Sequence, residues 1–176
     1  MTGGVGMSHL NPGRRQPYRL GEPRYEELWQ PVAFCCSVHQ RRPLLLADDV
    51  PRVLTDTLLE AAAQHGSAVI AYCIVPDHVH YLACVVEKGG NLRSMIEWFK
   101  RVSARRISGI GFNAPIWQRS YWDRHLRPHE KTSQAVDYIL DNPVRKGLCR
   151  NRDDWEHSGF FGYPWDAIDE DSRKNG

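Results

Sequence analysis

The stretch SAVIAYCIVPDHVHYLACVV, residues 67–86, decides the fold of this chain. It contains two runs of apolar and β-branched residues, 67–75 and 78–86, that have the composition of β-strands. Only Pro76 and Asp77 separate the two runs, and a connection this short favours an antiparallel hairpin. We therefore expect the hairpin to form part of an antiparallel sheet.

Strand-like and helical patterns continue on both sides of the hairpin. In chain order the sequence predicts strand 32–38, helix 50–65, the hairpin, helix 91–107, strand 116–126 and helix 131–141. Gly66 is placed to end the first helix, Asn91 to cap the second, and Pro143 to stop the third. This order predicts an α+β domain whose helices pack mainly on one face of a single sheet.

The chain length suits one domain flanked by two irregular ends. It has 176 residues, of which 41% are apolar and 25% charged, a balance typical of globular proteins. We expect a flexible basic arm over 1–20, one domain over 21–150 and an irregular acidic extension over 151–176. No apolar run approaches the roughly 20 residues of a membrane helix, and no signal-peptide pattern is present, so we expect a cytoplasmic protein.

The cysteines and the charges point to a reducing compartment and a polyanionic partner. The five cysteines are odd in number and form no CxxC pair, so we expect free, mostly buried thiols and no zinc site built from them. The net charge is only +2, but basic residues gather in the first two thirds of the chain and acidic residues at its end. A basic body with an acidic tail is typical of binding to a polyanion.

The pair His78 and His80 is the sharpest local feature. Side chains at i and i+2 leave the same face of a strand, so both imidazoles can converge on one metal ion while Val79 points into the core. Two histidines on one exposed strand face are also common without a metal. A second pair, His125 and His129, straddles Pro128 and is a weaker candidate.

Tyr138 and Asn142 form the second candidate feature. One helical turn separates them, which brings both to the same side of the predicted helix. A metal held by His78, His80 and the Asn142 oxygen would polarise a phosphate beside Tyr138, because all three ligands are neutral. Taken alone, Asn142 is equally explained as a helix cap before Pro143, and Tyr138 as a half-buried core residue.

Three segments together resemble the REP-associated tyrosine transposases, a branch of the single-tyrosine HUH endonucleases, in which U stands for a hydrophobic residue. The segments are YCIVPDHVHYL at 72–82, IWQRSYWDRHLR at 116–127 and YILDNPVRKGL at 138–148. They occur in the family's order, and the resemblance spans about 18–149. Val75 stands where the family usually has methionine, and Lys146 where alanine is common.

The resemblance implies a ferredoxin-like fold with the histidine pair on a central strand and the tyrosine helix packed across it. It also implies that Tyr138 attacks a DNA phosphodiester to give a 5′-phosphotyrosine, with Mg²⁺ or Mn²⁺ held by His78, His80 and Asn142. The implied substrate is single-stranded DNA beside a palindromic REP hairpin, in the bacterial cytoplasm and near the nucleoid. Tyr121 is the rival nucleophile, although no amide or carboxylate lies one helical turn from it.

Basic and aromatic side chains provide a predicted path for the DNA. Arginines can contact phosphates, and aromatic faces can stack on unpaired bases. The candidates are Arg14, Arg15, Lys100, Arg101, Arg105, Trp117, Arg119, Arg124 and Arg127. Each is also explained by an ordinary solvated charge or by core packing.

Two other functions remain open on the sequence. One is a non-cleaving module that binds hairpin DNA or RNA, and the other is a metal-dependent hydrolase of small phosphate esters. A covalent adduct at Tyr138 would separate the transposase-like enzyme from both. The sequence leaves open whether the protein is a monomer or a homodimer.

Overall fold

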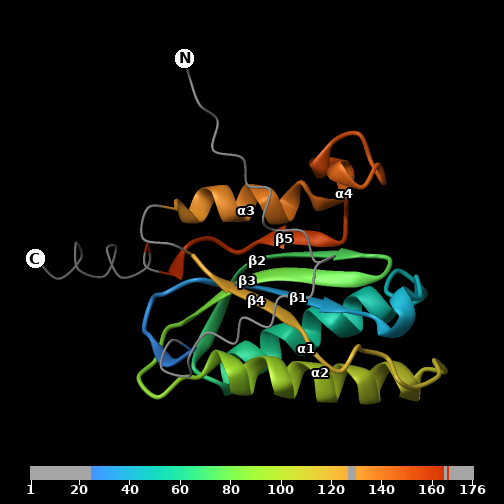
Figure 1. Ribbon diagram of the computed structural model, residues 1–176, viewed down its shortest axis with the longest axis horizontal. Helices are drawn as coiled ribbons and strands as arrows, with labels where there is room; N and C mark the ends of the chain where they lie inside the picture. Colours follow the sequence, from blue (N-terminus) through green and yellow to red (C-terminus); the bar gives the residue numbers. More distant parts are fainter. Residues whose placement is uncertain (1–24, 127–129, 165, 167–176) are drawn as a thin grey trace, which may run out of the picture.

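A five-stranded antiparallel sheet forms the centre of the computed structural model, which describes residues 25–126, 130–164 and 166 (Figure 1). In chain order the elements are β1 (Val32–Ser37), η2 (His39–Arg41), α1 (Val50–Gln64), β2 (Ser67–Val75), β3 (His78–Val85), α2 (Leu92–Gly109), β4 (Trp122–His125), α3 (Thr132–Leu140), α4 (Asn142–Arg145), η3 (Arg152–Asp154) and β5 (Ser158–Phe160). The strand order is β4-β1-β3-β2-β5, so the predicted hairpin occupies the middle of the sheet. The succession β1-α1-β2-β3-α2-β4 is that of a ferredoxin-like domain, as expected.

The two faces of the sheet are covered by different helices (Figure 1). On one face, here called the α1–α2 face, α1 and α2 pack on Phe34, Val79 and Tyr81. On the other, the α3 face, α3 packs on Ala33, Cys73 and Leu82. The two longest helices thus share one face, as predicted, and the short helices α3 and α4 add cover to the opposite face.

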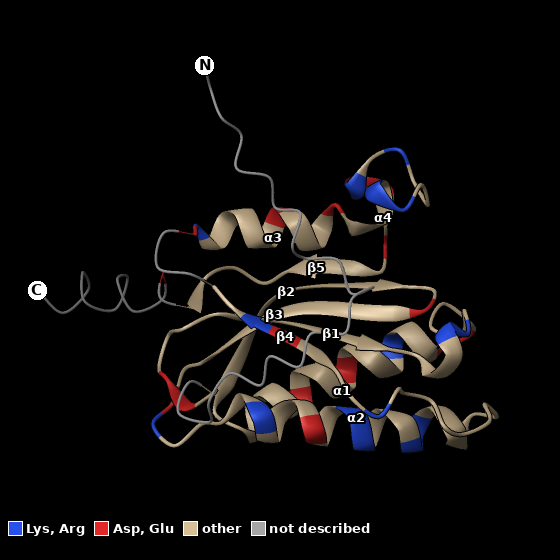
Figure 2. Ribbon diagram, viewed as in Figure 1, with Lys and Arg blue, Asp and Glu red and all other residues tan. Residues whose placement is uncertain are grey.

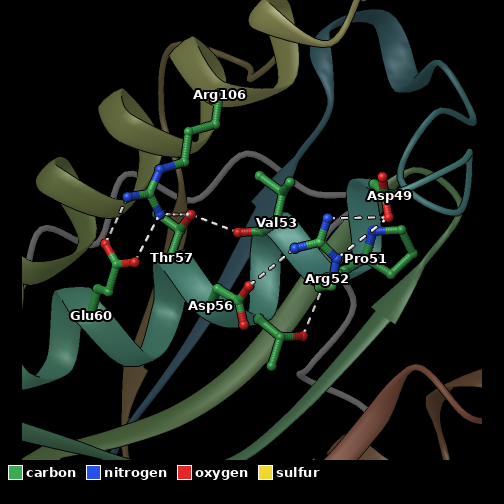
Figure 3. A network of polar contacts seen from close by, with 9 residues as sticks. Asp49, Pro51, Arg52, Val53, Asp56, Thr57, Glu60 and Arg106 are labelled. Atoms are coloured by element: carbon green, nitrogen blue, oxygen red, sulfur yellow. Dashed lines mark hydrogen bonds and ion pairs between the residues drawn. The ribbon is translucent and has the colours of Figure 1, made fainter.

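A polar network joins the two long helices on the side away from the sheet (Figure 3). Arg106 of α2 donates to both carboxylate oxygens of Glu60, at 3.1 and 2.8 Å, and to the Thr57 hydroxyl at 2.9 Å. Thr57 in turn donates to the backbone oxygen of Val53 at 2.6 Å. Arg106 is therefore engaged in contacts that hold α1 against α2.

Most predicted elements are confirmed to within two residues. Asn91 caps α2 as expected, since its side-chain oxygen accepts from the Ser94 amide at 3.0 Å. Gly66, with φ of 57°, follows the end of α1 in the left-handed conformation that favours glycine.

Two predictions of local structure were wrong in extent. The strand expected over 116–126 is regular only in β4, because residues 113–121 form a loop that meets the chain just after β1 at an isolated Val38–Trp117 bridge. The extension after residue 151 is not wholly irregular, because β5 pairs with β2 and adds an edge strand to the sheet. Its position is supported by stacking of Phe161 on Tyr72, with ring centroids 5.7 Å apart.

The cysteines are free, as predicted, and four of the five are buried. Cys36 lies in the α1–α2 core, while Cys73 and Cys84 lie on the α3 face. Among the described residues, no helix is both long and apolar enough to cross a membrane.

Candidate metal centre

His78 and His80 lie on the central strand β3 and project toward the α3 face. Val79, between them, packs in the α1–α2 core, as the two-residue period of a strand requires. The two imidazole centroids are 4.8 Å apart, and the residues are only 0% and 4% exposed. The pair is therefore buried under α3 rather than displayed on an open strand face.

Cys35 completes a three-residue cluster with the histidines. It lies opposite His80 in the β1–β3 register, and one potential ligand atom from each of Cys35, His78 and His80 falls within 4.8 Å of the other two. We call these three residues the His–Cys cluster. The sequence alone could not join Cys35 to the histidines, because their proximity depends on how β1 pairs with β3, about 45 residues away. The sequence offered no reason to expect a zinc site built from the cysteines, and the structure brings one of them, Cys35, within reach of both histidines.

Asp77 holds the His78 ring in one orientation. The His78 Nδ1 lies 2.6 Å from an Asp77 oxygen, whose partner oxygen is 3.2 Å from Arg41. This hydrogen bond to His78 lowers the pKa of Asp77 to about 2, and burial lowers the pKa of His78. A neutral ring that donates from Nδ1 leaves Nε2 as an acceptor, and Nε2 has no hydrogen-bond partner among the described residues.

Burial also keeps His80 neutral and the Cys35 thiol protonated while no metal is bound. Burial, and after it the nearby His78, lower the pKa of His80 well below its usual range. Burial raises the pKa of the Cys35 thiol to about 12. Neutral imidazoles are the form in which histidine binds a metal ion.

Asn142 is the first residue of α4, and its side-chain oxygen is buried without a hydrogen-bond donor from the described protein. The residue is 3% exposed, and its Oδ1 has no hydrogen-bond partner in the described part of the chain. Asp141, rather than Asn142, is the C-cap of α3, so the simple capping explanation does not apply. Buried acceptors at His78 and Asn142, with the ligand atoms of the His–Cys cluster, are the donor set that a divalent ion would satisfy.

Tyr138 lies on α3, on the same side of the sheet as the histidines. It is half-buried, and the Arg145 guanidinium lies 3.7 Å from its ring centroid while donating to its backbone oxygen at 2.7 Å. Burial raises the pKa of Tyr138, Arg145 opposes this shift, and Cys35 adds to it. Tyr138 and the His–Cys cluster lie on the same face of the sheet, Tyr138 on α3 and the cluster on β1 and β3.

The positive charges that surround the cluster come from residues the sequence did not single out. Arg41 Nη1 lies 3.4 Å from His78 Nδ1. Burial lowers the pKa of His80 most, His78 adds to this effect, and Arg145, Lys146 and Arg41 lower it further. Figure 2 shows the basic residues of α4 on the α3 side of the molecule. The signal that could have found them is the segment following Asn142, where two basic residues stand side by side.

The predicted basic residues of α2 lie on the other side of the sheet. Arg101 and Arg105 are exposed on α2, which covers the α1–α2 face (Figures 1 and 2). The Lys100 amine donates to the backbone oxygens of Gln118, Arg119 and Ser120 at 2.8–3.2 Å, so it fastens a loop. The sheet therefore separates these three basic side chains from the His–Cys cluster.

The remaining predicted DNA contacts divide between the core, the surface and the undescribed parts of the chain. Trp117 is 7% exposed, and its ring donates to Ser103 inside the core, so packing is its role in this structure. Arg119 is exposed, whereas Arg124 is paired with Glu130 at 2.6 Å on the α3 face. Arg14, Arg15 and Arg127 lie outside the described residues.

The two weaker candidates of the sequence are not supported as an active centre. Tyr121 packs against Phe34 on the α1–α2 face, away from the histidine pair. His125 is buried in β4, and its predicted partner His129 lies outside the described residues. Trp122, by contrast, lies opposite Cys35 in the β1–β4 register and is half-buried on the α3 face.

The fold and the site define a class of protein: an antiparallel α+β domain whose central strand presents two histidines to a helix that carries a tyrosine. Residues 26–142 match the family described as "Transposase IS200 like", and because this range exceeds half of the chain, the chain belongs to that family.

Within this family the chain is similar to REP-associated tyrosine transposases. A Haemophilus influenzae protein named "Putative REP-associated tyrosine transposase" is 28% identical over 66% of this chain and 76% of the relative. The REP-associated tyrosine transposase of Escherichia coli is 24% identical over 72% of this chain and 74% of the relative. A solved REP-associated tyrosine transposase bound to a REP hairpin has a TM-score of 0.65 at 22% identity, covering 77% of this chain and 79% of that one. The resemblance predicted from three short segments and the α+β fold are confirmed.

Proposed function

We propose that this chain is a metal-dependent single-stranded DNA endonuclease and strand transferase that uses Tyr138 as its nucleophile. The observation that carries the proposal is the position of Tyr138 and Asn142 over the sheet face that bears His78 and His80. Packing alone would not explain two neutral imidazoles and two buried acceptors without partners among the described residues, His78 Nε2 and Asn142 Oδ1, on the side of the sheet that α3 and α4 cover.

His78, His80 and Asn142 would hold Mg²⁺ or Mn²⁺, and an ion bound there would supply Lewis-acid polarisation of the scissile phosphate. The Tyr138 oxygen attacks phosphorus and loses its proton, the bond from phosphorus to the 3′-oxygen breaks, and the departing 3′-oxygen takes up a proton to become a 3′-hydroxyl. The products are a 5′-phosphotyrosine and a free 3′-end. Attack by a second 3′-hydroxyl reverses the same steps and transfers the strand.

The side chains around Tyr138 suit a DNA strand. The cations of Arg41, Arg145 and Lys146 meet the phosphates near the histidines, while Arg145 also lies over the phenol and favours its charged form. Trp122, half-buried on the α3 face, is the aromatic surface for an unpaired base. The named relatives and the solved complex support a REP hairpin as the substrate, and we place the reacting phosphate in a single strand that flanks the hairpin.

The test is covalent capture of the DNA by the tyrosine. Purified protein is incubated with hairpin oligonucleotides that carry a single-stranded flank, in Mn²⁺, and the products are separated under denaturing conditions and weighed by mass spectrometry. We expect a protein–DNA adduct on Tyr138 that Tyr138→Phe loses completely and Tyr121→Phe retains. Tight, salt-sensitive binding with no adduct in any metal would instead identify a non-cleaving hairpin-binding module.

A further inference from the structure

A cysteine stands beside the histidine pair where the proposed chemistry requires none. Cys35 is 2% exposed and lies in one row across the sheet with Trp122 of β4 and His80 of β3. Its sulfur is within 4.8 Å of a ligand nitrogen of each histidine. We infer that Cys35 is a third protein ligand of this centre and that the centre binds a thiophilic divalent ion of the zinc class. The inference rests on the proposed function in taking His78 and His80 as metal ligands, and it departs from that function in the identity of the ion, which would be of the zinc class instead of Mg²⁺ or Mn²⁺.

The composition of the His–Cys cluster decides the class of ion. Two imidazoles and one sulfur are the ligands that Zn²⁺ and Co²⁺ prefer, whereas Mg²⁺ requires oxygen ligands in an octahedron. The cluster has no carboxylate, because the nearby Asp77 is used by His78 and Arg41. Asn142 supplies one neutral oxygen at most, so its presence does not turn the site into a magnesium site.

Burial favours coordination of the cysteine over a role in packing alone. A cysteine that only fills space is surrounded by apolar side chains, as Cys36 is in the α1–α2 core. Cys35 instead lies beside two imidazoles. One of them, His78, is fully buried, and its Nε2 has no hydrogen-bond partner among the described residues. An ion shared by the three groups would satisfy that nitrogen, and its binding releases the thiol proton to solvent.

The neighbouring cysteine offers a matched control. Cys36 follows Cys35 in the same strand, is equally buried, and points to the opposite face. Cys73 flanks His80 on the other side, in the β2–β3 register, but does not belong to the cluster of possible ligands. Replacing each by alanine removes the same sulfur from three positions that differ in their distance from the histidines.

The experiment is a Co²⁺ titration of the full chain without DNA, followed by ultraviolet and visible absorption. We expect one equivalent of Co²⁺ to produce a thiolate-to-cobalt charge-transfer band that Zn²⁺ displaces and excess Mg²⁺ does not. Cys35→Ala should lose this band and bind Co²⁺ at least about tenfold more weakly, since even the loss of an outer partner of a metal ligand costs that much. Cys36→Ala and Cys73→Ala should keep both the band and the affinity.

A second measurement needs no variant. X-ray absorption at the zinc edge of the wild-type protein should show one sulfur at about 2.3 Å together with nitrogen ligands. A zinc shell of nitrogen and oxygen alone, or a charge-transfer band that survives Cys35→Ala, overturns the inference. Because the titration contains no DNA, cobalt binding through Cys35 without any DNA adduct would support this inference and remove the proposed function. A DNA adduct on Tyr138 without the thiolate-to-cobalt band would support the proposed function and overturn the inference about Cys35.

Discussion

The two faces of the central strand β3 differ more than any other pair of regions in this molecule. Val79, Tyr81 and Ala83 enter the α1–α2 core, where aromatic rings stack and almost every contact is apolar. His78 and His80, each one residue away, enter the α3 face beside Cys35. Because successive side chains of a strand point to opposite faces, β3 places core residues on one face and the candidate metal ligands on the other.

The cost of this arrangement falls on the α3 face. Buried acceptors without a partner, such as Nε2 of His78 and Oδ1 of Asn142, each destabilise a folded chain by about 1–3 kcal/mol. The large core on the α1–α2 face offsets this cost, since it collects most of the fully buried large side chains. We therefore expect substitutions on the α3 face to change the rate of adduct formation and substitutions on the α1–α2 face to change the free energy of unfolding.

The sharpest test replaces two neighbours in β3. His80→Ala should lower the rate of Tyr138 adduct formation by at least about a hundredfold, because a metal ligand is lost. Val79→Ala should keep that rate per folded molecule but reduce the free energy of unfolding by about 2 kcal/mol, because it leaves a cavity in the core. Adduct kinetics and urea unfolding measure the two effects.

These two variants share a strand and differ only in the face they alter. If folded Val79→Ala protein also lost adduct formation, the idea that only the α3 face of β3 takes part in the reaction would be wrong. An intact rate in His80→Ala would remove the histidine pair from the chemistry.

The next effect concerns the orientation of His78. Asp77→Asn removes the carboxylate that accepts from Nδ1 at 2.6 Å but keeps the size of the side chain. We expect the Mn²⁺ concentration at half-maximal adduct formation to rise about tenfold, with little change in the rate at saturating Mn²⁺. The matched control is Asp123→Asn, a half-buried carboxylate on β4 that does not contact the histidines. A rate that falls equally at all Mn²⁺ concentrations would mean that Asp77 does not act through the metal.

Much of this arrangement was predictable from the sequence, because short-range patterns determine it. The hairpin follows from two β-forming runs with a two-residue connection, and the common face of His78 and His80 follows from the strand period. The order of elements and the resemblance of three segments were enough to predict the α+β class. The pairing of Tyr138 with Asn142 stays a prediction, because α3 ends at Leu140 and Asn142 begins α4 instead of completing a turn of the same helix.

The residues that could not be predicted depend on long-range pairing. Cys35 joins the histidines only through the β1–β3 register, and β5 joins the sheet only by pairing with β2. Lys100 and Trp117 are residue types that often contact DNA. In this structure Lys100 holds a loop through backbone oxygens, and Trp117 packs in the core. Composition cannot distinguish these roles, because they are decided by which face of the sheet each residue meets.

A smaller effect is expected from the arginine over the phenol. Arg145→Ala should slow adduct formation by about five- to tenfold, because the charge that opposes the raised pKa of Tyr138 is lost. Arg152→Ala is the control, since Arg152 pairs with Asp137 and Asp141 on the outer side of α3. The two variants should be compared at several pH values. The deficit of Arg145→Ala should shrink as the pH rises toward the pKa of the phenol, and a deficit that stays constant would indicate phosphate binding instead.

The smallest effect concerns a polar group of the α1–α2 core that has no hydrogen-bond partner among the described residues. The Tyr81 hydroxyl is buried and has no hydrogen-bond partner among the described residues, although its ring stacks on Phe34 at 5.1 Å. Tyr81→Phe keeps the ring and removes the unsatisfied group, so the free energy of unfolding should rise by about 1 kcal/mol. Tyr25→Phe should do the opposite, because the Tyr25 hydroxyl donates to Asp123 at 2.7 Å and its loss leaves a half-buried carboxylate with one partner fewer. Urea midpoints at constant m-value test both signs, and a loss of stability in Tyr81→Phe would mean that its hydroxyl has a partner, such as a buried water, within the core.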